Sequence, residues 1–265
     1  MLDTAERHDA ASLLWLAERH SRPIEPLVNI YPAMEVVDAY EIQLLNIRRK
    51  LADGAAICGH KVGLSSRAMQ QMMGVHEPDY GHSLTDMALE DGEAVSLSGF
   101  CYPRIEVEVA FVLGRGLPGE DCTCTDVLDA TEYVAPAMEL IDSRIHEWRI
   151  GIADTIADNA STARFVLGSQ RHSPADIDLA DIDAVLYCGQ PGREVEMTRG
   201  NSRAVLGNPI AAVAWLARKL ANFGGRLEAG HTVLPGSCTK AVDVVPGDRF
   251  LAEFAGPGTV SIEFR

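Results

Sequence analysis

Apolar side chains recur at helical spacing in the first fifty residues of the chain. In the opening segment MLDTAERHDAASLLWLAERH, Asp3 and Glu6 have the spacing of a capping box at the start of a helix. A second segment, AMEVVDAYEIQLLNIRRKLADG, ends at the stop signal Gly54 and has its apolar positions on one face, namely Val37, Tyr40, Leu44, Ile47 and Leu51. The pattern predicts that residues 1–54 form a helical cap.

Alternating apolar positions and turn residues dominate the rest of the chain. Residues 55–66 are predicted to form a short buried strand, after which Ser65 or Ser66 caps a helix through RAMQQMMG. The segment HEPDYGHSLTD that follows is rich in turn residues. Further strands, mostly bounded by Gly, Pro or Asp, are predicted at 93–99, 105–113, 137–143, 184–189, 193–200, 231–237, 249–254 and 259–264.

Two helices are predicted between these strands. Thr125 can cap the segment DVLDATEYV, and Asn208 with Pro209 has the sequence of a helix N-terminus. Strands and helices do not alternate regularly, which argues against a doubly wound sheet or a TIM barrel. We therefore expect an α+β fold, a mixed β-roll or sandwich, in a single domain 1–265 whose residues 55–265 form the β-rich core.

The predicted strand PRIEVEVAFVLG contains two acids between apolar residues. Successive side chains of a strand point to opposite faces, so Glu106 and Glu108 share a face with the apolar Ala110 and Val112. The other face carries only Val107, Val109 and Phe111. The acids therefore mark either the solvent rim of a sheet or a pocket for a positively charged group.

The charge balance restricts the partners of the chain. The 38 acidic residues against 23 basic ones give a net charge of −15, which argues against nucleic acid or an anionic membrane surface as partner. No apolar run approaches the roughly 20 residues of a membrane span. An anionic substrate would bind only where a local cation outweighs this field.

The remaining composition favours a cytoplasmic protein with reduced thiols. The first residues are acidic, unlike the basic start of a signal peptide. Six cysteines are scattered along the chain, and the only close pair, Cys122 and Cys124, lacks the second pair that a zinc site needs.

The acids on the predicted strand have the spacing of metal ligands. Side chains two residues apart on a strand lie roughly 7 Å apart at their base, so Glu106 and Glu108 can converge on one cation. Glu139 also interrupts an apolar strand and is the best candidate for a third ligand. Hard divalent ions such as Mg²⁺ prefer carboxylate oxygens. A solvated strand face explains the same pattern, and this alternative stays open at the level of spacing.

Other candidate residues have equally simple structural explanations. Lys61 lies between Gly59 and Gly63, as a surface lysine at a strand end would. Asp79 fits a turn former, and the polar cluster at 154–161 has the composition of caps and turns.

Six ordered blocks of the sequence resemble one known family. They are GHKVGLSSRAMQQMMGVHEPDYG, PRIEVEVAFVLG, PAMELIDSRI, DTIADNASTARFVLG, NPIAAVAWLARKL and VLPGSCTKAV. In this order they are similar to the 2-keto-4-pentenoate hydratase and 4-oxalocrotonate decarboxylase family of the fumarylacetoacetate hydrolase superfamily, from about residue 30 onward. The resemblance implies the β-roll of that superfamily's C-terminal domain and a homo-oligomer, either a dimer or a larger ring.

The resemblance also implies a set of site residues. It implies a site for Mg²⁺ or Mn²⁺ made of Glu106, Glu108 and Glu139, the trio that the strand pattern suggests. It further implies that Lys61, Asp79 and Ser161 line the pocket of a small anionic substrate, with Lys61 and Asp79 in proton transfer. A lysine beside a divalent cation in a partly dry pocket is expected to have a lowered pKa.

The implied reaction is the addition of water to 2-hydroxypenta-2,4-dienoate, or a short alkyl homologue, to give 4-hydroxy-2-oxopentanoate. This step belongs to the meta-cleavage degradation of aromatic rings or steroids. Alternatives within the family are decarboxylation of 4-oxalocrotonate and hydration of 2-oxohept-4-ene-1,7-dioate. Asp79 and the LPGSCT block favour hydration over decarboxylation.

Two alternatives belong to a different class, namely a C–C hydrolase of acylpyruvates and a non-catalytic ligand-binding module. Such hydrolases use a His and Glu pair on a mobile lid. The histidines near the family blocks are His60 and His82, and we expect His82 to be a surface loop residue.

Overall fold

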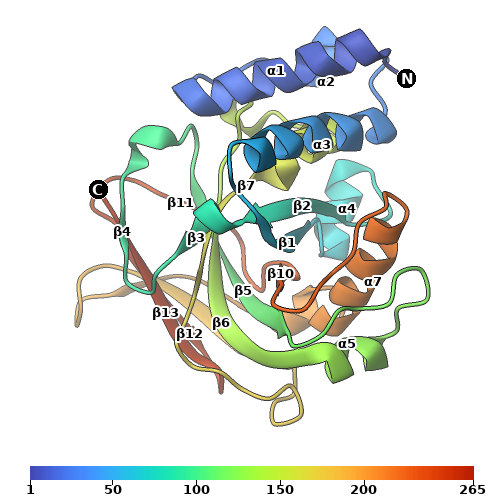
Figure 1. Ribbon diagram of the computed structural model, residues 1–265. Helices are drawn as coiled ribbons and strands as arrows, with labels where there is room; N and C mark the ends of the chain where they lie inside the picture. Colours follow the sequence, from blue (N-terminus) through green and yellow to red (C-terminus); the bar gives the residue numbers. More distant parts are fainter.

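The computed structural model describes residues 1–265 and contains two β-sheets flanked by helices (Figure 1). The α-helices are α1 (Thr4–His20), α2 (Leu27–Ile30), α3 (Val36–Ala52), α4 (Arg67–Met73), α5 (Cys124–Ala130), α6 (Ile152–Ala157) and α7 (Pro209–Ala221). The 3-10 helices are η1 (Thr85–Met87), η2 (Leu97–Gly99), η3 (His146–Trp148), η4 (Asn159–Ser161) and η5 (Ser202–Ala204). No helix is both long enough and apolar enough to cross a membrane.

The strands form two separate sheets. The strands are β1 (Ile57–Gly63), β2 (Asp79–Leu84), β3 (Ala88–Leu89), β4 (Ala94–Val95), β5 (Arg104–Leu113), β6 (Thr131–Ile141), β7 (Thr162–Leu167), β8 (Asp183–Cys188), β9 (Val195–Asn201), β10 (Thr232–Leu234), β11 (Val242–Asp243), β12 (Arg249–Phe254) and β13 (Gly258–Phe264). The eight-stranded sheet has the order β2-β1-β10-β5-β6-β7-β3, with β11 paired to β5, and the five-stranded sheet has the order β4-β13-β12-β8-β9. Parallel pairs such as β1–β10 occur beside antiparallel ones such as β5–β6, as the predicted mixed sheet requires.

The two faces of β5 enter different parts of the core. Val107, Val109 and Phe111 belong to the main buried cluster, together with side chains of β12 and β13 from the second sheet. Ala110, on the face that carries the acids, belongs to a second and smaller buried cluster. The predicted alternation is therefore confirmed, and the acid-bearing face is not a solvent rim.

The helical start of the chain largely follows the prediction. Helices α1 and α3 lie side by side at one end of the eight-stranded sheet (Figure 1). The capping box of α1 is present, since Asp3 Oδ1 accepts from the backbone N–H of Glu6 and Glu6 Oε2 accepts from that of Asp3, both at 2.9 Å. The expected face of α3 is wrong at one position, because Val37 is 50% exposed. Asp38 is instead buried and pairs with Arg7 of α1.

Two helix starts were predictable from their capping residues. Ser66 caps α4 by accepting from the backbone N–H of Met69. Helix α7 begins at Pro209, and the side chain of Asn208 accepts from the backbone N–H of Ile210. Helix α7 lies next to α5 (Figure 1). Side-chain oxygens thus satisfy backbone donors that a helix start leaves free.

Three predicted elements are wrong in type or extent. The segment taken as turn-rich is strand β2, which pairs with β1. Helix α5 is capped by Thr123 rather than Thr125 and ends at Ala130, because the β-branched and aromatic residues from Thr131 onward join β6. The strand predicted at 93–99 is reduced to β4 and the 3-10 helix η2.

Candidate active site

Three carboxylates converge on the acid-bearing face of the eight-stranded sheet. Glu106 of β5 pairs directly opposite Glu139 of β6, and Glu108 lies two residues further along β5 on the same face. One oxygen from each carboxylate lies within 4.8 Å of the others. The close approach of these three acids is the arrangement expected from the sequence.

Burial changes the acidity of this cluster. Glu108 and Glu139 have no exposed surface. Desolvation, together with the charge of Glu139, raises the pKa of Glu106 to about 7, although Lys61 counteracts the shift. Desolvation and repulsion from the other two carboxylates raise the pKa of Glu108 well above its ordinary value. Lys61 therefore does not fully compensate the negative charge of the three carboxylates.

The backbone of the loop after β10 contributes one donor to this cluster. The N–H of Gly236 donates to Glu108 Oε2 at 2.7 Å. Gly236 has φ of +127°, and a Cβ built there would lie 1.9 Å from Ser65 Oγ. Only glycine fits this close packing. The glycine of the LPGS sequence therefore allows the loop to bring its N–H to Glu108 and hold that carboxylate in place. This role was not predictable from the sequence, because a backbone donor has no residue-type signal.

Lys61 lies beside the carboxylates and is not a surface lysine. It is 3% exposed, and its Nζ lies 3.3 Å from Glu139 Oε2 and donates to the carbonyl of Ala160 at 2.9 Å. Burial alone would lower the pKa of Lys61, but Glu139 and the other nearby acids raise it overall. In the metal-free chain the neighbouring acids therefore favour the ammonium form of Lys61, whereas the lowered pKa is expected beside a bound divalent cation and stays a prediction.

Asp79 lies on the same face of the sheet as Lys61. It begins β2, where it pairs with Gly63 of β1, two residues from Lys61. Asp79 is buried, both carboxyl oxygens lack a hydrogen-bond partner, and a Cβ on Gly63 would lie 2.1 Å from Asp79 Oδ1. Burial raises the pKa of Asp79 to about 6, although Lys61 opposes the shift. Asp79 is thus not a turn former.

Ser161 ends the short 3-10 helix η4, which contains Ala160, the acceptor of Lys61. Ser161 is buried, and its Oγ lies 3.3 Å from Thr155 Oγ1. No contact connects it directly with the three glutamates. The structure therefore brings Lys61 into contact with Glu139 of the cluster and places Ser161 one residue from the backbone carbonyl that binds Lys61.

His82 is not a surface loop residue as expected. It lies in β2 and is 5% exposed, and its Nδ1 is 3.0 Å from Gln43 Oε1. Gln43 Nε2 donates to two backbone carbonyls, so Oε1 must accept and His82 donates through Nδ1. Desolvation lowers the pKa of His82 to about 4. The residue is a neutral part of the core.

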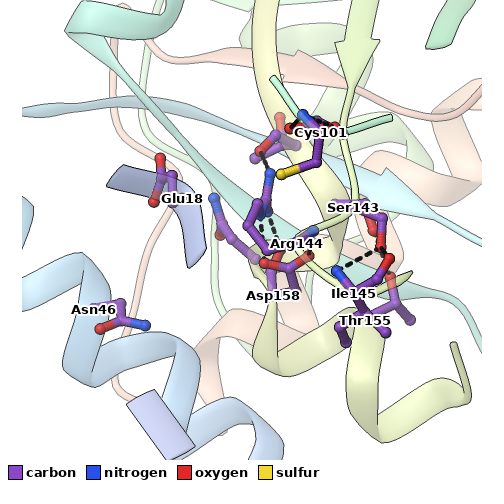
Figure 2. Close-up of polar contacts among 12 residues, drawn as sticks. Glu18, Asn46, Cys101, Ser143, Arg144, Ile145, Thr155 and Asp158 are labelled. Carbon is purple, nitrogen blue, oxygen red and sulfur yellow. Dashed lines mark hydrogen bonds and ion pairs between the residues drawn. The ribbon is translucent and has the colours of Figure 1, made fainter. Parts of the chain in front are cut away.

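A cavity of about 530 Å³ lies elsewhere, between α1, α3 and the end of β6, and none of the six predicted site residues lines it. Figure 2 shows part of its wall, where Glu18 faces Arg144 and Arg144 pairs with Asp158. Glu18 pairs in turn with Lys50. Because these charged groups already have partners, the cavity offers less unsatisfied chemistry than the carboxylate cluster.

Known proteins of similar sequence cover nearly the whole chain. Residues 51–265 match the family model of the fumarylacetoacetate (FAA) hydrolase C-terminal region. A 2-keto-4-pentenoate hydratase of Paraburkholderia xenovorans (strain LB400) is 42% identical over 260 residues, covering 98% of this chain and 95% of that protein. A 2-hydroxyhexa-2,4-dienoate hydratase of Comamonas testosteroni is 44% identical over 253 residues, covering 95% of this chain and 94% of that protein.

A solved structure has the same fold over the full length. The 4-oxalocrotonate decarboxylase from Pseudomonas putida G7, complexed with magnesium and adipate, has a TM-score of 0.95 and 35% sequence identity. The match covers 100% of this chain and 99% of that chain. It confirms the α+β fold expected from the resemblance. The chain belongs to the fumarylacetoacetate hydrolase family, within the group of 2-keto-4-pentenoate hydratases and their relatives.

Proposed function

We propose that the chain is a metal-dependent hydro-lyase that adds water to 2-hydroxypenta-2,4-dienoate, or to a short alkyl homologue, and yields 4-hydroxy-2-oxopentanoate. The observation that carries the proposal is the convergence of three glutamates, two of them buried and Glu106 half-buried, beside Lys61 in a chain with a net charge of −15. Such a chain binds an anionic 2-oxo acid only where a local cation outweighs its field. The hydratase names of relatives at 42% and 44% identity support the same reaction.

The carboxylate cluster suits a hard divalent cation. The Oε1 atoms of Glu108 and Glu139 are buried without a hydrogen-bond partner, which is costly unless another group satisfies them. Three carboxylates and no sulfur or nitrogen donor favour Mg²⁺, with Mn²⁺ as the alternative. The structural neighbour with magnesium supports this choice. When bound, the cation offsets the buried charge and stabilises negative charge on the oxygens of a 2-oxo acid.

The residues beside the carboxylates can move the protons that hydration requires. In the reaction C5 gains a proton, the 2-hydroxyl group loses one, and water adds its oxygen at C4 and a proton at C3. In our proposal Lys61, an ammonium, donates a proton to C5 and is restored by the proton that the 2-hydroxyl group loses. Asp79, whose pKa is raised to about 6, is ionised at neutral pH, accepts a proton from the attacking water and returns it at C3. Ser161 lines the pocket. General acid and base groups of this kind contribute about 10²- to 10⁴-fold to a rate.

An absorbance assay tests this proposal. Freshly prepared 2-hydroxypenta-2,4-dienoate is mixed with the protein, and loss of its ultraviolet absorbance is followed with Mg²⁺, without Mg²⁺ and with a chelator. We expect metal-dependent loss of the dienol and recovery of 4-hydroxy-2-oxopentanoate. No such product with Mg²⁺ present would end the proposal.

A pair of lysine variants tests the assigned proton donor. Lys61→Met is expected to lower kcat by about 10²-fold or more, because it removes the only lysine that contacts the carboxylate cluster. Lys219→Met is the matched control, since Lys219 lies on α7 and pairs with the exposed Glu77, which precedes β2. Equal turnover by both variants would remove Lys61 from the mechanism.

Decarboxylation of 4-oxalocrotonate is the second candidate, because the structural neighbour with a TM-score of 0.95 bears that name. Decarboxylation needs no water at C4, so the buried and unpartnered carboxylate of Asp79 favours hydration. Two assays test the diacid alternatives. Release of CO₂ from 4-oxalocrotonate would indicate a decarboxylase, and hydration of 2-oxohept-4-ene-1,7-dioate would indicate a hydratase of that diacid. Cleavage of an acylpyruvate would instead reveal a C–C hydrolase.

The organisation of the protein is part of the same proposal. We expect a single catalytic domain over residues 1–265, a homo-oligomer that is a dimer or a larger ring, and a cytoplasmic location. Light scattering of the purified protein measures the oligomer. Limited proteolysis that released residues 1–54 as a separate stable fragment would contradict the single domain.

A further inference from the structure

The 3-10 helix η4 has a strained backbone next to Lys61. Asn159, Ala160 and Ser161 have φ of 54°, 50° and 59°, so three consecutive residues other than glycine adopt the left-handed conformation. In this conformation the Cβ atom of an L-residue lies too close to the following carbonyl oxygen, so each such residue is strained. Strain of this kind persists only where the surrounding structure fixes the backbone, and it occurs preferentially at functional sites.

The ends of this turn are anchored by Arg144. The guanidinium group donates from Nε to Asp158 Oδ1 and from Nη2 to the Asp158 carbonyl, and the backbone N–H of Arg144 donates to Asp158 Oδ2 (Figure 2). Nη1 of the same group donates to the carbonyl of Thr162 at 3.3 Å. One buried side chain therefore holds the residues directly before and after Asn159–Ser161.

The turn is also held through the side chain of Asn159, its first residue. Its Oδ1 accepts from the backbone N–H of His82 at 2.8 Å, and its Nδ2 donates to the carbonyl of His82 at 2.9 Å. These bonds satisfy the free edge of β2, which ends the sheet. Gly81 permits the approach, because a Cβ there would lie 2.3 Å from the carbonyl oxygen of Asn159. An amide provides both the donor and the acceptor that this edge requires.

The two hydrogen bonds between the Asn159 side chain and the His82 backbone fix the carbonyl that binds Lys61. Ala160 follows Asn159 directly, and its carbonyl accepts from Lys61 Nζ at 2.9 Å. The other close contact of this ammonium is Glu139 Oε2 at 3.3 Å. We infer that Asn159 is a positioning residue of the proposed reaction, which clamps the turn to β2 and thereby holds the Lys61 ammonium in place through the Ala160 carbonyl. The inference rests on the proposed function.

Three variants test this inference. Asn159→Ala removes both bonds to His82, whereas Asn159→Asp keeps the acceptor for the His82 N–H and loses the donor. Asn201→Ala is the control, since Asn201 also makes side-chain hydrogen bonds but lies at the edge of the five-stranded sheet. Measurements are kcat and KM with the dienoate, the Mg²⁺ dissociation constant by calorimetry, and the thermal midpoint.

A positioning role predicts a loss confined to turnover. We expect Asn159→Ala to lower kcat by about 10- to 100-fold, because displacement of a reacting group by about 1 Å can cost 10²-fold. KM and Mg²⁺ affinity should stay within about threefold. Asn159→Asp should recover part of kcat, and Asn201→Ala should match the wild type. Unchanged kcat in Asn159→Ala, a parallel loss of Mg²⁺ affinity, or no recovery in Asn159→Asp would each overturn the inference.

A crystal structure of Asn159→Ala separates this inference from the proposed function. It needs no substrate, so it stays informative if the wild type fails to hydrate the dienoate. We expect the contact between Lys61 Nζ and the Ala160 carbonyl to lengthen beyond hydrogen-bond distance. A contact unchanged from 2.9 Å would show that Asn159 does not position Lys61.

Discussion

The carboxylate cluster should destabilise the metal-free protein increasingly as the pH rises, because the cluster carries excess negative charge in a poorly solvated place. The critical variant is Glu106→Gln, which removes one ionisable group and keeps the shape of the side chain. Glu106 has a pKa raised to about 7 in the folded protein from an ordinary value of 4.5. The folded state therefore binds more protons than the unfolded state above pH 4.5, and the free energy of unfolding falls as the pH rises.

The size of this effect follows from the shift. Each unit of pKa corresponds to about 1.4 kcal/mol, so ionisation of Glu106 destabilises the fold by about 3 kcal/mol at pH 7 and by about 1 kcal/mol at pH 5. At this half-buried position, hydrogen bonds that the glutamine amide fails to make cost about 1–3 kcal/mol, and this cost is the same at every pH. The pH dependence of the difference between the two proteins, rather than its absolute sign, is thus diagnostic.

Urea unfolding in the presence of a chelator measures this difference. The free energy of unfolding of the wild type, minus that of Glu106→Gln, should fall by about 2 kcal/mol between pH 5 and pH 7. Glu253→Gln, an exposed glutamate of β12, should show no such change. Addition of Mg²⁺ at about 100 times its dissociation constant should stabilise the wild type by about 2.7 kcal/mol and the Gln variant much less. A difference that does not vary with pH would refute the reasoning about buried charge.

Three further predictions concern the residues that support the site. Gln43→Leu should lower the free energy of unfolding by about 3 kcal/mol in urea, because it leaves His82 and two buried carbonyls without partners. The pKa of His82 is lowered to about 4, so the stability that neutral His82 contributes is complete above about pH 6.5 and is lost as the pH falls. The free energy of unfolding of the wild type, minus that of His82→Leu, should therefore drop by about 2 kcal/mol from pH 7.5 to pH 5. Gly63→Ala should displace Asp79 and lower kcat by about 10-fold or more, whereas an active variant would show that the Asp79 carboxylate can move without loss.

The acids of the site were predictable because their signal is local. A strand has a period of two, so the sequence alone places Glu106 and Glu108 on one face and requires an explanation for the apolar residues that follow them. Helix starts were predictable for the same reason, since the residues that cap α1 and α7 lie within three positions of the groups they satisfy. The apolar continuation of the strand left a pocket and a solvent rim as alternatives, and only the packing of the fold excludes the rim.

Strand β2 was not predictable from local sequence. Its residues include Gly, His and Asp, which are common in turns, and they form a strand only because β1 and Asn159 supply hydrogen-bond partners. Because this segment was predicted to be turn-rich, Asp79 and His82 were predicted to be loop residues, whereas both are buried in β2. The pKa of Lys61 in the metal-free chain was not predictable for a related reason, since burial and neighbouring carboxylates act on it in opposite directions and only the fold sets their balance.

The remaining parts of the site join residues that are distant in sequence. Lys61 binds a carbonyl 99 residues away, and Glu108 binds a backbone N–H 128 residues away. Both partners are main-chain groups, so the residue type at Ala160 carries no chemical signal, and Gly236 signals only that a side chain would not fit. Loops rather than strands supply these groups, because strand N–H and C=O groups are already used in the sheet. The sheet therefore fixes the carboxylates, and the strained turn and the glycine loop orient the groups around them. Substitutions in the strained turn should change turnover before they change metal binding, whereas substitution of Gly236 should also weaken metal binding, because its N–H holds Glu108.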